Sequence, residues 1–161
     1  MSFDDELRKA IERGQQRGEA QAHAMQKHAL TEEEFKRLHS QLRLDLSEHI
    51  ESCIHRLPNF FPGFRFETMI GESGWGAACF RDDLTITRGT RSSVYSRLEI
   101  TVRPYSQTLH VLELTGKGTI RNKEVFNRTW FEKLEDASGE KFRALIDAWV
   151  LEYAELYAVR E

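Results

Sequence analysis

The sequence predicts an α+β fold with an N-terminal long helix or helical hairpin, an antiparallel meander of five or six strands, and a C-terminal helix packed on the sheet. Two patterns support this prediction: a period-2 ribbon over residues 93–103, and apolar stripes of helical period before and after it. Such a ribbon is typical of a strand with one buried and one wet face. Its apolar side holds Val94, Leu98, Ile100 and Val102, and its other side holds Tyr95, Arg97, Glu99, Thr101 and Arg103.

The composition of the chain is that of a globular protein with one domain. Its 161 residues are enough to bury a substantial core. No apolar run approaches the roughly 18 residues that cross a membrane, and the acidic start is no secretory signal. Cys53 and Cys79 lie far apart in apolar surroundings. We therefore expect a cytoplasmic protein with free thiols and no disulfide.

Residues 1–29 have two open interpretations, a weak helix or a flexible arm. Four small residues, Ala10, Gly14, Gly18 and Ala22, recur every four positions and would let another backbone approach closely. The two glycines each cost a helix about 1 kcal/mol relative to alanine. The stripe to which they belong has helical spacing and consists of Phe3, Leu7, Ala10, Ile11, Gly14, Gly18, Ala22 and Met25.

Residues 30–57 predict a long helix that starts at a capping box, Thr31 to Glu34, with Leu30 and Phe35 as a hydrophobic staple. Pro58 is expected to end the helix at Leu57. One apolar face runs through Phe35, Leu38, Leu42, Leu46, Ile50, Cys53 and Leu57.

The length of this helix predicts a homodimer. It spans about 39 Å, whereas strands of about six residues span roughly 20 Å. The apolar face continues to both ends of the helix, so a second copy of the chain is expected to cover the surplus. The candidate interface residues are Phe35, Leu38, Leu42 and Leu46.

Residues 64–126 are expected to form a meander of five or six strands. Turns are predicted at residues 71–74, at Asp82–Asp83, at residues 88–90 and at the glycine pair around Lys117. Pro104 is expected to end the central strand or to place it at an edge of the sheet.

Residues 129–160 predict C-terminal helices. A second capping box, Thr129 to Glu132, predicts a short helical turn, and the last helix is expected to begin near Ser138. That helix should pack on the apolar face of the sheet through Phe142, Leu145, Ile146, Trp149, Tyr153, Leu156 and Tyr157.

His49 and Cys53 stand four residues apart, a spacing that would let both reach one metal ion. The sequence offers no CxxC or HExxH pair to complete a four-ligand site. We therefore expect His39 and His49 to be histidines of the apolar face, with Asp45 available to bond His49. No metal or cofactor is predicted.

The outer face of the predicted sheet is a candidate surface for anions or nucleic acid. Residues 84–128 carry 8 Lys/Arg against 3 Asp/Glu, and aromatic rings between basic groups could stack bases while the cations neutralise phosphates. Cross-strand ion pairs produce the same pattern. The candidate residues are Tyr95, Arg97, Arg103, Tyr105, Arg121 and Lys123.

The sequence contains no catalytic signature. Our leading hypothesis is a non-enzymatic protein-interaction module that forms a homodimer. The alternatives are a nucleic-acid or anion binder that uses the basic sheet face, and a small-molecule-binding protein or enzyme with a pocket between the Phe-rich linker at residues 58–63 and the sheet.

Overall fold

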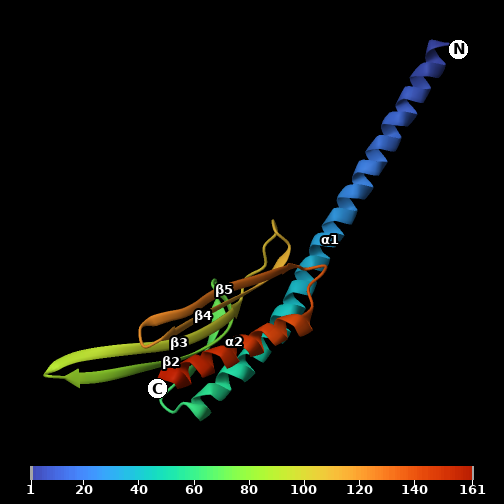
Figure 1. Ribbon diagram of the computed structural model, residues 1–161. Coiled ribbons are helices and arrows are strands. Elements are labelled where there is room, and N and C mark those ends of the chain that lie inside the picture. The colour runs from blue at the N-terminus through green and yellow to red at the C-terminus, as the bar shows by residue number, and fades with distance from the viewer. Residues whose placement is uncertain (1, 161) are drawn as a thin grey trace. The chain divides into compact units, whose positions relative to one another are not determined.

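The computed structural model describes the backbone of residues 2–160 and the side chains of residues 2–24 and 31–159. It contains two compact units, Met1–Arg37 and Leu38–Glu161, which we call the N-terminal and the C-terminal unit. The predicted α+β architecture is confirmed (Figure 1). The elements are α1 (Phe3–Phe60), β1 (Arg65–Gly71), β2 (Gly74–Thr87), β3 (Thr90–Val102), β4 (Val111–Ile120), β5 (Lys123–Lys133) and α2 (Gly139–Arg160).

Helix α1 is one helix where the sequence analysis predicted two segments. Thr31 lies inside it and begins no helix, because residues 25–30 contain neither glycine nor proline and nothing interrupts the helical backbone. The side chain of Leu30, the expected staple residue, lies outside the described residues. The helix also passes its predicted end at Leu57: the N–H of Phe61 donates to the carbonyl of Leu57 at 2.9 Å, beyond Pro58.

The sheet is a five-stranded meander in the order β1-β2-β3-β4-β5, and each pair of neighbours is antiparallel. The predicted turn at residues 71–74 is confirmed. So is the turn at Arg88–Gly89, where the φ angles are 55° and 80°. The central strand β3 also matches its prediction, since Leu98, Ile100 and Val102 are fully buried.

The predicted turn around Lys117 is wrong, because Gly116 and Gly118 lie inside β4. The turn between β4 and β5 comes later, at Arg121 and Asn122, whose φ angles are 49° and 69°. The glycines serve packing: a Cβ on Gly116 would lie 2.6 Å from the Cε3 atom of Trp149. Helix α2 therefore approaches the strand more closely than a side chain at this position would allow.

Two further local predictions are corrected by strand pairing. Asp82 and Asp83 form no turn but continue β2, where they face Tyr95 and Val94 across the ladder with β3. Residues 129–132 form no helical turn but belong to β5, which pairs with β4 along its length. Thr, Trp and Phe fit a pleated sheet well, and ladder hydrogen bonds outweigh the local capping pattern.

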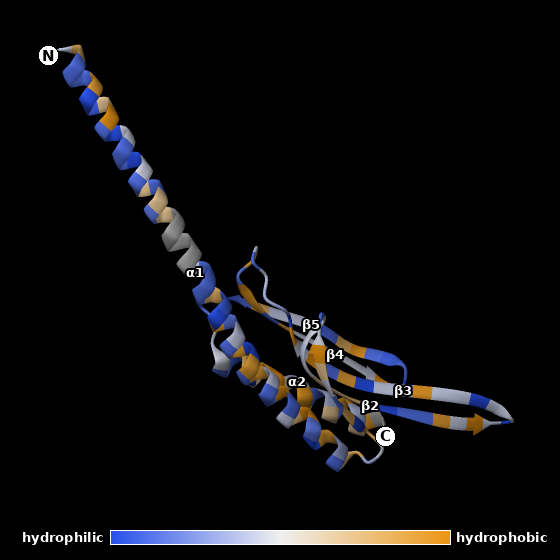
Figure 2. Ribbon diagram, turned by 180° about the vertical axis from the view of Figure 1, so that it is seen from behind, coloured by the Kyte–Doolittle hydropathy of each residue, from blue (hydrophilic) through white to orange (hydrophobic). Residues whose placement is uncertain are grey.

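The core of the C-terminal unit lies between one face of the sheet and a layer of two helices, α2 and the part of α1 within this unit (Figures 1 and 2). Their contacts with the sheet include His55 of α1 against Phe66 of β1, with ring centroids 4.9 Å apart, and Trp149 of α2 against Gly116. The fully buried side chains include Leu46, Ile50, Ile54, Leu98, Ile100, Leu112, Leu114, Ile120, Leu134, Phe142, Ile146 and Tyr153.

Helix α2 begins as predicted. The N–H of Lys141 donates to the Ser138 hydroxyl at 3.4 Å, and the N–H of Phe142 donates to the Ser138 carbonyl at 3.2 Å. Ser138 is therefore the N-cap of the helix.

Candidate functional site

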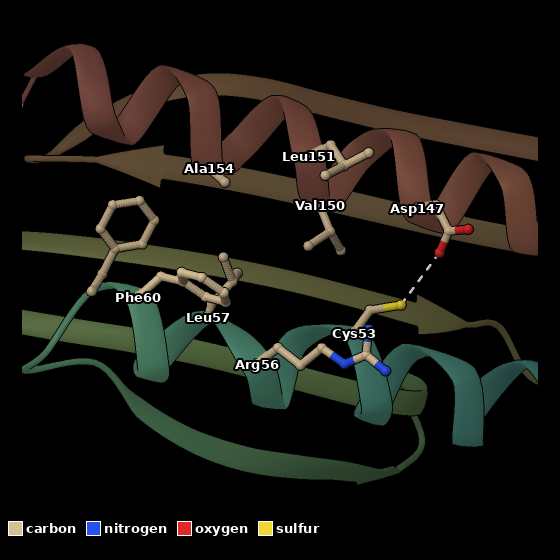
Figure 3. A pocket seen from close by; sticks show the side chains of 9 residues that line it. Cys53, Arg56, Leu57, Phe60, Asp147, Val150, Leu151 and Ala154 are labelled. Atoms are coloured by element: carbon tan, nitrogen blue, oxygen red, sulfur yellow. Dashed lines mark hydrogen bonds between the residues drawn. The ribbon is translucent and has the colours of Figure 1, made fainter.

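An apolar groove of about 570 Å³ runs between the last turns of α1 and the middle of α2 (Figure 3). Each helix turns its buried apolar stripe toward the sheet. The side chains next to that stripe on α1 then face those of α2 on the side away from the sheet, and the groove lies between them. Phe60 and Leu151 at the groove are large apolar residues that remain 77% and 69% exposed. The lining residues are Cys53, Arg56, Leu57, Phe60, Phe61, Asp147, Val150, Leu151 and Ala154.

Three potential metal ligands converge beside this groove: His49 and Cys53 from α1, and Asp147 from α2. His49 Nε2 lies 2.8 Å from Asp147 Oδ1, Cys53 Sγ lies 3.3 Å from the same oxygen, and Sγ lies 3.5 Å from Nε2. His49 and Cys53 share one side of α1 because they are one turn apart. Figure 3 shows the Cys53 thiol and the Asp147 carboxylate pointing toward one another from the two helices.

The electrostatics of the cluster keep the thiol of Cys53 protonated. Burial raises the pKa of Cys53 to about 11, and the hydrogen bond to Asp147 and its negative charge act in the same direction. The guanidinium of Arg56 opposes this shift but does not overcome it. At neutral pH, Cys53 is therefore a thiol and a weak nucleophile.

The arrangement does not match a Cys–His–Asp catalytic set. In such a set, one ring nitrogen of the histidine faces the thiol and the other faces the carboxylate. Here the thiol and the carboxylate of Asp147 both lie against the same atom, His49 Nε2. The histidine therefore cannot take a proton from Cys53 while Asp147 holds its other nitrogen.

Two of these three residues, His49 and Cys53, are visible in the sequence as a pair, but the partner predicted for His49 is wrong. The expected partner, Asp45, instead forms an ion pair with Arg143 of α2. Asp147 is 98 residues from His49 in the chain, and no local pattern marks it. His39 is a core histidine as predicted: it is 3% exposed, and its Nε2 lies 3.2 Å from the carbonyl of Arg103.

The structure separates the six residues of the candidate anion surface. Tyr95 and Arg97 lie together on the outer face of β3, where Arg97 Nη1 donates to the Tyr95 hydroxyl at 3.5 Å. Arg103 lies six residues farther along the chain, and its Nη1 donates to the carbonyl of Ser73 at 2.9 Å. Tyr105 lies beyond the end of β3, and its ring contacts His39 and His110. The remaining two, Arg121 and Lys123, lie at the turn between β4 and β5.

The central cation of that surface is already paired. Arg97 donates to Glu67 at 2.8 Å and to Glu99 at 3.2 Å. Partial burial alone would lower the pKa of Arg97, but its bonds to Glu67 and Tyr95 and the charge of Glu99 raise it above the usual value. Cross-strand ion pairs of this kind account for the basic pattern of β3 without a bound anion.

The four candidate interface residues divide between the two units. Leu46 is fully buried in the core of the C-terminal unit. Leu42 is half-buried and lies near Gly139 at the start of α2. Leu38 and Phe35 have intermediate exposure, and Phe35 belongs to the N-terminal unit. The inner two leucines are therefore used within the chain itself.

Comparison of the chain with protein-family models, with curated proteins and with solved structures found no match. Among the described residues, no helix combines the length and the apolarity required to cross a membrane.

Proposed function

We propose that this chain is a non-enzymatic, cytoplasmic protein-interaction module that works as a homodimer and associates through the N-terminal part of α1. One observation carries the proposal: every described side chain from Ser2 to Ala24 is exposed. The large apolar residues Phe3, Leu7 and Ile11 are 74%, 47% and 52% exposed. They lie on one face of the helix at helical spacing.

The N-terminal unit has no means of covering this face within itself. It consists of one helix, so it has no second element against which its apolar stripe can pack. Most helical stability in proteins comes from the packing of an apolar face, and Gly14 and Gly18 weaken the helix by about 1 kcal/mol each. A partner helix would supply the missing contact.

The glycines support close approach by such a partner. No atom of the described residues lies within 4 Å of a Cβ built on Gly14 or Gly18, so no described contact requires glycine at either position. A second helix that packs closely against this face would require small residues there.

The large and small residues of the stripe are also placed to match one another in an antiparallel pair of copies. The large residues Phe3, Leu7 and Ile11 precede the small residues Gly14, Gly18 and Ala22 along the stripe. A two-fold antiparallel pair centred between Ile11 and Gly14 would therefore set these three large side chains against the three small ones. The facing residues would be Phe3 with the partner's Ala22, Leu7 with the partner's Gly18, and Ile11 with the partner's Gly14.

The two alternative functions have weaker support. A nucleic-acid surface on the sheet would need free cations, whereas Arg97 is held by Glu67 and Glu99. The third hypothesis places a small-molecule pocket between the Phe-rich linker and the sheet. The described groove that includes Phe60 and Phe61 is instead formed by α1 and α2.

Multi-angle light scattering on the full chain tests the proposal. The wild type is expected at twice the 18.8 kDa mass of one chain. The variant Leu7→Glu/Ile11→Glu places charges in the interface and is expected at the monomer mass. The matched control Gln16→Glu/His23→Glu adds two carboxylates to the opposite face of the same helix and should remain dimeric. A monomeric wild type, or a dimer that survives Leu7→Glu/Ile11→Glu, would overturn the proposal.

Oxidative cross-linking tests the register in a Cys53→Ser background. A mixture of the Leu7→Cys and Gly18→Cys single variants is expected to form a mixed disulfide, because an antiparallel pair brings these positions together. Cross-linking of Leu7→Cys to itself, without the mixed product, would indicate a parallel pair instead.

A further inference from the structure

We propose that His49, Cys53 and Asp147 form a binding site for one divalent transition-metal ion, with Zn²⁺ as the best fit. The three donor atoms come from two helices and all lie within 4.8 Å of one another. The donors are an imidazole nitrogen, a thiol sulfur and a carboxylate oxygen, so the site is not a surface cluster of carboxylates. The site lies within the C-terminal unit, and its existence does not depend on the proposed dimer.

The distances between the donor atoms fit a tetrahedral ion. Metal–ligand bonds of about 2.0–2.3 Å at tetrahedral angles separate neighbouring ligand atoms by about 3.3–3.6 Å. The Sγ–Oδ1 and Sγ–Nε2 separations are 3.3 and 3.5 Å, and the Nε2–Oδ1 separation is 2.8 Å. Only the last of these must open, and the change is about half an ångström. The ligand geometry is therefore nearly formed before an ion enters.

The donor set selects the class of ion. Thiolate and imidazole ligands suit Zn²⁺ and its neighbours, whereas Mg²⁺ and Ca²⁺ require oxygen ligands. Three protein ligands leave the fourth tetrahedral position to water. Cys53 and Asp147 also line the apolar groove, so the ion would lie at its edge.

The protons balance without any further reactant. Cys53 would bind as a thiolate and release its proton to the buffer. His49 would bind through Nε2 as a neutral ring: the proton that Nε2 donates to Asp147 Oδ1 would leave to solvent, and Nδ1 would carry one instead. The carboxylate of Asp147 needs no change. The ion would thereby replace the hydrogen bonds that the thiol and the ring make to Asp147 Oδ1.

Cobalt(II) provides the most specific test, because it substitutes for zinc and reports its ligands in the optical spectrum. Titration of the full chain with Co²⁺ is expected to give one ion per chain, the visible bands of a tetrahedral site and a thiolate-to-cobalt band in the near ultraviolet. Zn²⁺ is expected to displace the cobalt and abolish these bands. Absence of binding, or six-coordinate cobalt without a thiolate band, would overturn the proposal.

Substitutions assign the ligands. Cys53→Ser is expected to abolish the thiolate band, and His49→Gln and Asp147→Asn are each expected to weaken Co²⁺ affinity more than about tenfold. His23→Ala, at an exposed histidine of the N-terminal unit, is the matched control and should bind as the wild type does. Circular dichroism establishes that each variant is folded, and Asp147→Asn changes only a half-exposed side chain of nearly the same shape. A thiolate band that survives Cys53→Ser, or an unchanged affinity in folded Asp147→Asn, would show that the ion binds elsewhere.

Discussion

The indole of Trp149 packs directly against the backbone of β4 at Gly116. A Cβ built on Gly116 would stand 2.6 and 2.9 Å from two atoms of that ring, closer than any real Cβ contact. Trp149 is 5% exposed and Ile146, one turn earlier in α2, is fully buried, so the ring has little space into which it could move. The distance between the helix and the sheet is therefore set by the absence of a side chain at Gly116.

Gly116→Ala is expected to destabilise the protein by about 1–3 kcal/mol, the usual cost of overpacking. The free energy of unfolding, measured with urea, checks this value. Gly139→Ala is the matched control, because a Cβ there meets only side-chain ends, those of Arg143, Asp45 and Leu42, at 3.4, 3.6 and 3.8 Å. Equal stability of the two variants would mean that α2 can shift away from the sheet.

Leu46→Ala is expected to lower the free energy of unfolding by about 2–5 kcal/mol, because the side chain is fully buried between α1 and the sheet. Leu44→Ala, two residues earlier on the same helix, removes a side chain that is 56% exposed. That control should change stability by no more than about 0.5 kcal/mol. A small effect at Leu46 would contradict the packing of this part of α1.

His39 is expected to make stability fall in mild acid. Burial lowers the pKa of its ring below the usual value, more than the hydrogen bond to the Arg103 carbonyl raises it, and the charge of Arg43 adds to the lowering. The unfolded chain therefore binds the proton first as the pH falls below about 6.5. The stabilising contribution is complete above that pH and is lost as the pH falls through the lower pKa of the folded state.

Urea unfolding at about pH 7.5 and about pH 5 measures this effect. His39→Gln can still donate a hydrogen bond to the Arg103 carbonyl but does not titrate, so its stability should depend less on pH than that of the wild type. His23→Gln, at an exposed histidine, should retain the dependence of the wild type. An identical dependence in His39→Gln would exclude this histidine as the cause.

Single-stranded RNA is expected not to bind, even in low salt, because Glu67 and Glu99 neutralise Arg97. Fluorescence anisotropy with a labelled oligonucleotide checks this prediction. The variant Glu67→Gln/Glu99→Gln releases Arg97 and should bind weakly, with an affinity that falls as salt is added. Salt-dependent binding by the wild type that is lost in Arg97→Ala would restore the nucleic-acid hypothesis.

The sequence alone determined the elements whose stabilising contacts repeat at a regular period. The alternation from Val94 to Val102 identified β3, and the stripe that contains Phe142, Trp149 and Tyr153 identified α2. These predictions succeeded because one buried face, repeated every 2 or 3.6 residues, outweighs any single residue. The turns at residues 71–74 and 88–90 could also be predicted from the sequence, because glycine marks positions that need a positive φ angle. Gly71, Gly74 and Gly89 have such angles.

Tertiary structure alone decided the features in which a local signal competes with a distant partner. The glycine pair at Gly116 and Gly118 is typical of a turn, but both residues lie in a strand. They are glycines because the rings of Trp149 and Tyr153 leave no space for a Cβ there. The capping pattern at Thr129 gives way to the ladder with β4. His49 lies one turn after Asp45, yet its partner is Asp147 on the other helix, because α1 and α2 turn these side chains toward their common seam. The spacing of His49 and Cys53 was visible in the sequence, but the third donor exists only where the two helices pack side by side on the sheet.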